Sequence, residues 1–124
     1  MADILDDSIL KTMRKMIGPS EDYEYFDPDL IIHINTVFSI LCQMGLGNDT
    51  GTFKITGEDE TWSDFLGDNH DNLEMVKSYM YFKMKLMFDP PQSSFVLKSY
   101  EDQARELEWR IWAAVDPKEM SDDT

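Results

Sequence analysis

Apolar residues recur at helical spacing in four stretches of the chain, and proline or glycine stands beside most of them. In the first stretch the apolar positions between Leu5 and Ile17 share one side, and Gly18-Pro19 is expected to end that helix. The second stretch begins at Asp27-Pro28, an N-cap followed by proline at the first helical position, and ends at about Met44. Its apolar arc is wide, so this helix is expected at the centre of the fold.

The third stretch predicts a helix over residues 69–88, and Asp89-Pro90-Pro91 is expected to break it. This helix carries two apolar stripes, and one core cannot easily use both of them. The stripe without an obvious intramolecular partner consists of Met75, Tyr79, Phe82 and Leu86. These four residues are therefore predicted to contribute to an interface.

The fourth helix is expected to start at Ser93 or Ser94 and to run to about Ala114, with one apolar face toward the core. Its opposite side carries Phe95 and Trp109, with Trp112 at the margin. Tryptophan is enriched at the energetic centres of interfaces, so this side of the helix is a second candidate contact surface. The alternative is that residues 46–69 fold back and cover these aromatic side chains.

Residues 46–69 lack a long helical pattern and contain a short alternating segment, Thr52–Thr56. They predict a long loop or a short β-hairpin, pinned at its return by one helical turn around Trp62. The expected fold is a small, mainly α domain of four helices with this loop or hairpin between helices two and three. Residues 1–115 are expected to form one domain, and residues 116–124 an acidic, flexible tail.

Charge limits what the surface can bind. The 124 residues include 11 Lys and Arg against 25 Asp and Glu, a net charge of -14 at pH 7. Since affinity for DNA comes mainly from cations that neutralise phosphates, this surface is not expected to hold a duplex tightly. The single cysteine, Cys42, excludes an intrachain disulfide and favours synthesis in a reducing host cytoplasm. The uncharged run from Leu30 to Asn48 contains several polar residues, so no membrane span is predicted.

Catalytic and metal-binding patterns are not evident in the sequence. The two histidines, His33 and His70, have no nucleophile in a recognisable arrangement with them. Residues 68–72 superficially match a calcium loop, but Leu73 and Tyr79 stand where that loop requires glycine and glutamate. We therefore expect no enzymatic activity, no cofactor and no bound metal.

Four strings of residues stand out along the chain: Phe26–Asn35, Thr61–Asp68, Phe88–Pro91 and Glu106–Arg110. In this order they resemble the head-tail connector, or adaptor, proteins of tailed bacteriophages. The resemblance implies a virion protein at the head-tail interface that forms a homo-oligomeric ring of about twelve copies under the portal protein. Such a ring lengthens the DNA channel, through which the genome passes without tight binding, and is a docking platform for stopper or tail-completion proteins. Portal contact is implied for residues 107–123, with Trp109, Arg110 and Trp112 as the central residues.

Two further hypotheses concern the acidic residues. The first places four loop carboxylates on the channel lumen, where they would let DNA slide; an outward-facing loop is the alternative. These carboxylates belong to Asp49, Glu58, Asp59 and Glu60. The second, a rival to the connector function, is an acidic DNA mimic that inhibits a host DNA-binding enzyme. The predicted third helix is net positive and the carboxylates concentrate in loops and termini, which weakens this rival.

Overall fold

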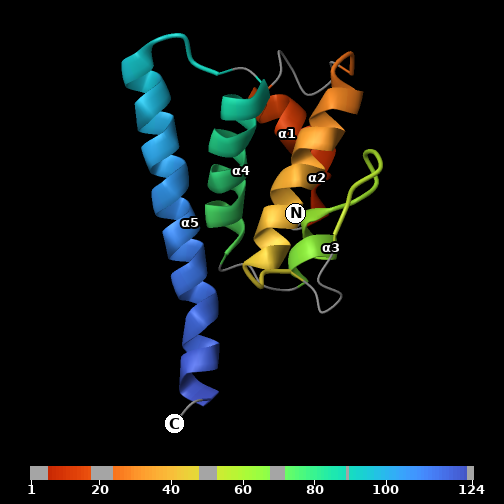
Figure 1. The fold of residues 1–124 in the computed structure, drawn as a ribbon. Helices are drawn as coiled ribbons and strands as arrows, with labels where there is room; N and C mark the ends of the chain where they lie inside the picture. Colours follow the sequence, from red (N-terminus) through yellow and green to blue (C-terminus); the bar gives the residue numbers. More distant parts are fainter. Residues whose placement is uncertain (1–5, 18–23, 48–52, 68–71, 89, 123–124) are drawn as a thin grey trace.

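Helices dominate the described part of the chain in the computed structural model (Figure 1). The structure describes residues 6–17, 24–47, 53–67, 72–88 and 90–122, with side chains up to residue 114. The helices are α1 (Ile9–Ile17), α2 (Asp27–Gln43), α3 (Trp62–Leu66), α4 (Leu73–Phe88) and α5 (Ser94–Asp122). The mainly helical fold class is therefore confirmed, with α3 as the expected single turn at the end of the loop.

Helix α4 lies between α2 and α5, and α1 packs against both α2 and α4. Helix α5 runs along α4 and continues past its end, since α5 has 29 residues and α4 has 16 (Figure 1). The projecting part of α5 extends away from the other helices (Figure 1). One side of the molecule is thus a single long helix attached mainly through α4.

An aromatic cluster holds α2, α3 and the loop together. Phe38 of α2 packs against Phe53, Trp62 and Phe65, with ring centroids 4.9, 6.3 and 4.6 Å away. The buried indole Nε1 of Trp62 donates a hydrogen bond to Thr12 Oγ1 at 3.2 Å, which ties the cluster to α1. Helix α3 is set at its start by a reciprocal capping box between residues 61 and 64. The loop returns to the core at a fixed point.

The described part of the loop, residues 53–61, bends at residues 57–58 and forms no strand ladder of its own. The side chain of Asn35 takes the place of a neighbouring strand: its Nδ2 donates to the Ile55 carbonyl at 3.1 Å, and its Oδ1 accepts from the Ile55 amide at 2.8 Å. Ile55 is buried beside α2 as a result. Of the two predicted forms, the structure has the loop over these residues, and residues 48–52 lie outside the described part.

Three predicted helix boundaries were wrong. Helix α4 starts at Leu73 and not near residue 69. The first helix starts at Ile9 and not near Leu5, because Ser8 pairs with Thr61 in an isolated bridge and its backbone is held by the loop. The last helix continues to Asp122 and does not end near Ala114. The segment after Ala114 contains helix-favouring Lys, Glu and Met, to which the predicted end of the helix gave too little weight. The domain limit at residue 115 and the flexibility of residues 116–124 stay predictions.

Candidate interaction site

The side of α5 that faces away from α4 exposes large aromatic residues. The side chains of Phe95, Trp109 and Trp112 are 83%, 70% and 43% exposed. Phe95 and Trp109 are separated by about four helical turns and point to the same side, roughly 21 Å apart along the axis. Ala104 and Ile111, on the opposite side of α5, are buried. The described part of the loop does not cover the three aromatic side chains, so the predicted surface on this helix is exposed.

Charged residues on the outer side of α5 form pairs within the helix. Arg110 donates from Nε to Glu106 Oε2 at 3.0 Å, and its Nη2 lies 2.9 Å from the same oxygen. Asp102 Oδ1 lies 3.5 Å from both Lys98 Nζ and Arg105 Nη1. Such exposed pairs stabilise a helix only slightly, but they bring opposite charges together on one surface. This surface is close to neutral although the chain is strongly acidic.

The second stripe of α4 is covered by α5, and the prediction that it lacks an intramolecular partner was wrong. Tyr79 is fully buried, and its hydroxyl donates to Glu108 Oε2 of α5 at 2.8 Å. Burial and this carboxylate contact raise the pKa of Tyr79 above its ordinary value. Phe82 packs edge-on against Tyr100 of α5 with centroids 5.2 Å apart, while Met75 and Leu86 are half-buried. Tyr79 is therefore a core residue and offers no surface to another protein.

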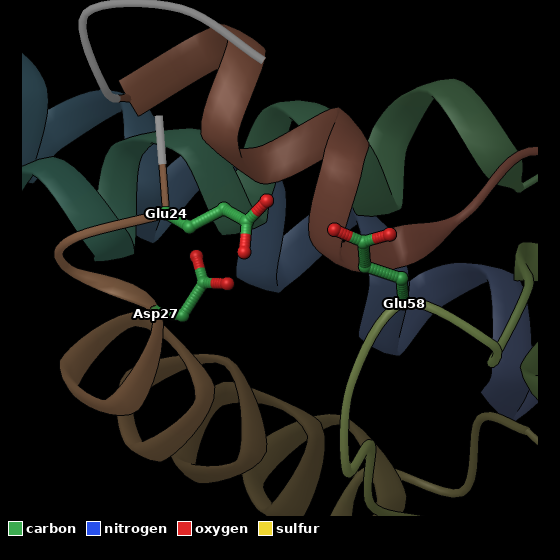
Figure 2. A group of neighbouring side chains, drawn as sticks. All are labelled: Glu24, Asp27 and Glu58. Atoms are coloured by element: carbon green, nitrogen blue, oxygen red, sulfur yellow. The ribbon is translucent and has the colours of Figure 1, made fainter. Parts of the chain in front are cut away.

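The structure also brings together three carboxylates from separate parts of the chain, and sequence reasoning did not predict this cluster. Figure 2 shows Glu24, Asp27 and Glu58 turned toward one another, with ligand atoms within 4.8 Å. A metal does not fit here, because the buried guanidinium of Arg14 already binds two of them. Its Nε and Nη2 donate to Asp27 Oδ1 and Oδ2 at 2.9 and 2.6 Å, and Nη2 lies 2.6 Å from Glu58 Oε2. The cluster ties α1, the start of α2 and the loop together.

One sequence signal could have revealed this cluster. Arg14 lies four residues after Leu10 and three before Ile17, so it shares the apolar face of α1 with two buried residues. A cation on such a face must have an anionic partner inside the fold. The signal predicts a buried ion pair, but it does not say which of the 25 acidic residues takes part.

Two of the four loop carboxylates bind within their own chain. Glu58 pairs with Arg14, and Glu60 accepts hydrogen bonds from the Thr56 hydroxyl at 2.8 Å and from the backbone of Thr56 and Gly57. Partial burial acts to raise the pKa of Glu60, but these hydrogen bonds outweigh it and lower the pKa below its ordinary value. Asp59 is exposed, and Asp49 lies outside the described residues. The luminal position of these residues stays a prediction.

The fold and the exposed aromatic surface define a small helical protein built to contact other proteins. A family model described as phage connector protein matches residues 9–118, from the first residue of α1 to well into α5. The chain therefore belongs to the phage connector protein family and has a structural connector role in the virion, as the resemblance implied. No curated protein and no solved structure was found to match. Within the described residues, no helix is both long and apolar enough to cross a membrane.

Proposed function

We propose that the chain is a head-tail connector that assembles into a closed ring beneath the portal, extends the DNA channel and carries the stopper or tail-completion proteins. The exposed aromatic surface of α5 is the observation that supports this most directly. A folded chain of this size with Trp109 at 70% exposure has a side chain suited to a protein partner. Family membership makes portal or tail proteins the expected partners.

We assign portal docking to the part of α5 from Leu107 onward, with Trp109, Arg110 and Trp112 as the central residues. This part includes the projecting end of the helix (Figure 1). A projecting helix can enter a groove on another protein without any rearrangement of the body that holds it. Trp109 would supply apolar contact area, and Arg110, held by Glu106, would supply donors at its edge.

Net charge favours assembly on the portal over assembly in solution. Each copy carries a net charge of -14 at pH 7, so copies in a ring repel one another, and the repulsion is stronger at low salt. A binding partner that holds several copies side by side offsets this repulsion through effective concentration. The same negative surface keeps DNA phosphates from adhering to the ring as the genome passes.

Sedimentation velocity and negative-stain imaging with the cognate portal protein test this proposal. The free chain is expected to sediment as a monomer or small oligomer, and addition of portal is expected to give portal particles capped by an extra ring. A stable closed ring at micromolar concentration without portal would contradict the proposed assembly order. Failure to bind portal, together with capture of a host restriction or transcription enzyme, would favour the DNA-mimic alternative.

A further inference from the structure

Helix α2 has an exposed side with no charged residue along three turns, which is unusual on a chain with 36 charged residues among its 124. The exposed residues of this side are Ile32, Thr36, Ser39 and Gln43. Ile32 is 61% exposed, a large fraction for an aliphatic side chain in mid-helix. We call this surface the neutral face of α2. Depletion of charge is a feature of the central parts of protein interfaces.

One polar side chain of the neutral face has a hydrogen-bond partner within its own helix. The Thr36 hydroxyl already donates to the Ile32 carbonyl of its own helix at 2.9 Å. The hydroxyl proton of Thr36 therefore keeps its hydrogen bond when water is removed from this face. Together with Ser39 and Gln43, the face forms a shallow depression bordered by Lys54 of the loop. Because the face itself carries no charged side chain, another protein can cover it without the desolvation of a charge.

A second surface of similar length lies on the first three turns of α5, around Phe95. Phe95 is 83% exposed and borders a shallow depression with Ser99, Asp102 and Gln103. The charge of Asp102 is balanced there by Lys98, whose Nζ lies 3.5 Å away. This second surface combines an aromatic side chain with locally cancelled charge, and it lies apart from Trp109 and the projecting end of α5.

From these two surfaces we propose that the neutral face of α2 in one copy packs against the Phe95 surface of α5 in the next copy, with Ile32 beside Phe95. This inference rests on the proposed ring. A sister copy is the occupant because each copy carries -14, so close approach of two copies is favoured where the facing surfaces carry no net negative charge. Both surfaces meet that requirement, whereas the loop and both ends of the chain are acidic.

The positions of the two surfaces suit a ring. Helix α4 separates α2 from α5, so the two surfaces lie on helices at opposite edges of the helix array (Figure 1). A contact in which two copies use different surfaces is heterologous. Repetition of such a contact gives a ring when the rotation from one copy to the next adds up to a full turn. A contact between identical surfaces would end at a dimer. The portal-binding end of α5 stays free in this arrangement.

Site-specific cross-linking with a short bismaleimide tests the pairing of surfaces. Ser39→Cys and Ser99→Cys are placed in the same full-length chain, in a Cys42→Ala background, and assembled on portal. Both serines are exposed, so the changes leave the core intact. We expect a ladder of covalent oligomers from the double variant and none from either single variant. A mixture of the two single variants should stop at dimers, as a heterologous contact requires.

The outcomes separate this inference from the proposed function. Rings seen on portal without a ladder, or an equal ladder from a control pair of Lys15→Cys on α1 with Ser99→Cys, would overturn the pairing and leave the connector function intact. The absence of any ring on portal would overturn both. As a second measurement, Ser39→Glu should raise the concentration needed for ring closure about tenfold, because it places a charge in the contact. The matched Ser39→Ala variant should leave that concentration unchanged, and equal behaviour of the two variants would contradict the inference.

Discussion

Trp62 and Trp109 are the same side chain in two regions with opposite surroundings. Trp62 has no exposed surface, packs against Phe38 and donates its indole proton to Thr12. Trp109 lies on the outer side of α5 with 70% of its surface in solvent. The first side chain joins three parts of one chain, and the second is available to another chain. Trp62 therefore contributes to the stability of the region formed by α1, α2, α3 and the loop, whereas Trp109 gives α5 an exposed side chain for binding.

Two arginines repeat this contrast. Arg14 is 2% exposed and binds carboxylates from the start of α2 and from the loop. Arg110 pairs with Glu106 one turn away on its own helix, and both side chains are about 60% exposed. The buried pair joins segments that are distant in the chain, and removal of one partner destabilises the fold because a charge is left without its counter-charge. An exposed pair within one helix contributes little. The following predictions test this contrast.

The largest effect is expected for Trp62→Ala. Removing this buried side chain leaves a cavity beside Phe38 and takes away the hydrogen bond to Thr12, so the free energy of unfolding should fall by about 3–5 kcal/mol. Urea unfolding followed by circular dichroism measures the loss. Trp109→Ala is the matched control and should change stability by less than about 0.5 kcal/mol. Similar losses in the two variants would remove the distinction between the regions.

A smaller loss is expected for Arg14→Met, about 3 kcal/mol in the free energy of unfolding. Methionine keeps the apolar part of the side chain but leaves the carboxylates of Asp27 and Glu58 close together without their shared cation. Glu58 is partly exposed, so water screens some of this repulsion. Arg110→Met is the control, with a change below about 0.5 kcal/mol. Equal stability of the Arg14→Met variant and the original chain would show that the cluster does not hold the loop.

The binding side of the contrast is tested by Trp109→Ala on portal docking. Truncation should weaken the binding of the chain to portal by about 2 kcal/mol, roughly a thirty-fold rise in Kd, as for other tryptophans central to interfaces. Surface plasmon resonance with immobilised portal measures the change, and the unfolding curve should stay as before. Unaltered affinity with a folded variant would exclude Trp109 from the portal contact.

The division between the two regions was partly visible in the sequence. Helical spacing located α2, α4 and the start of α5, because periodicity depends only on residues close in the chain. The exposed position of Trp109 also followed, since it lies opposite the buried side of its helix. The role of Asn35 could not be predicted, because its two hydrogen bonds to Ile55 depend on a loop path that the local sequence pattern does not specify. The same holds for the partners of Arg14, which come from distant segments.

The position of Tyr79 shows how pairing between helices was misjudged. The stripe of α4 that contains Tyr79 was predicted to lack an intramolecular partner because α4 has two apolar faces. However, α5 also has an apolar face that needs a partner. Matching the second stripe of one helix to the face of the next would have predicted the burial of Tyr79 against α5. The hydrogen bond from Tyr79 to Glu108 could not be predicted from the sequence. The pattern of α5 does not indicate which of its carboxylates points toward α4.

Tyr79→Phe gives the smallest effect and tests the joint between α4 and α5. The variant loses the hydrogen bond to Glu108, so the free energy of unfolding near neutral pH should fall by about 1 kcal/mol.

The pKa of Tyr79 is raised in the folded chain, so folding favours the protonated hydroxyl. This contribution is fully present below the ordinary tyrosine pKa of about 10 and is lost as pH rises above that value. The difference in stability between the original chain and the variant should therefore shrink above pH 10, as measured by urea unfolding at pH 8 to 11. Effects of pH that are common to the two chains cancel in the difference. A difference that stayed constant over this range would mean that the Tyr79 hydroxyl is not held by Glu108, and that α5 is joined to α4 by apolar packing alone.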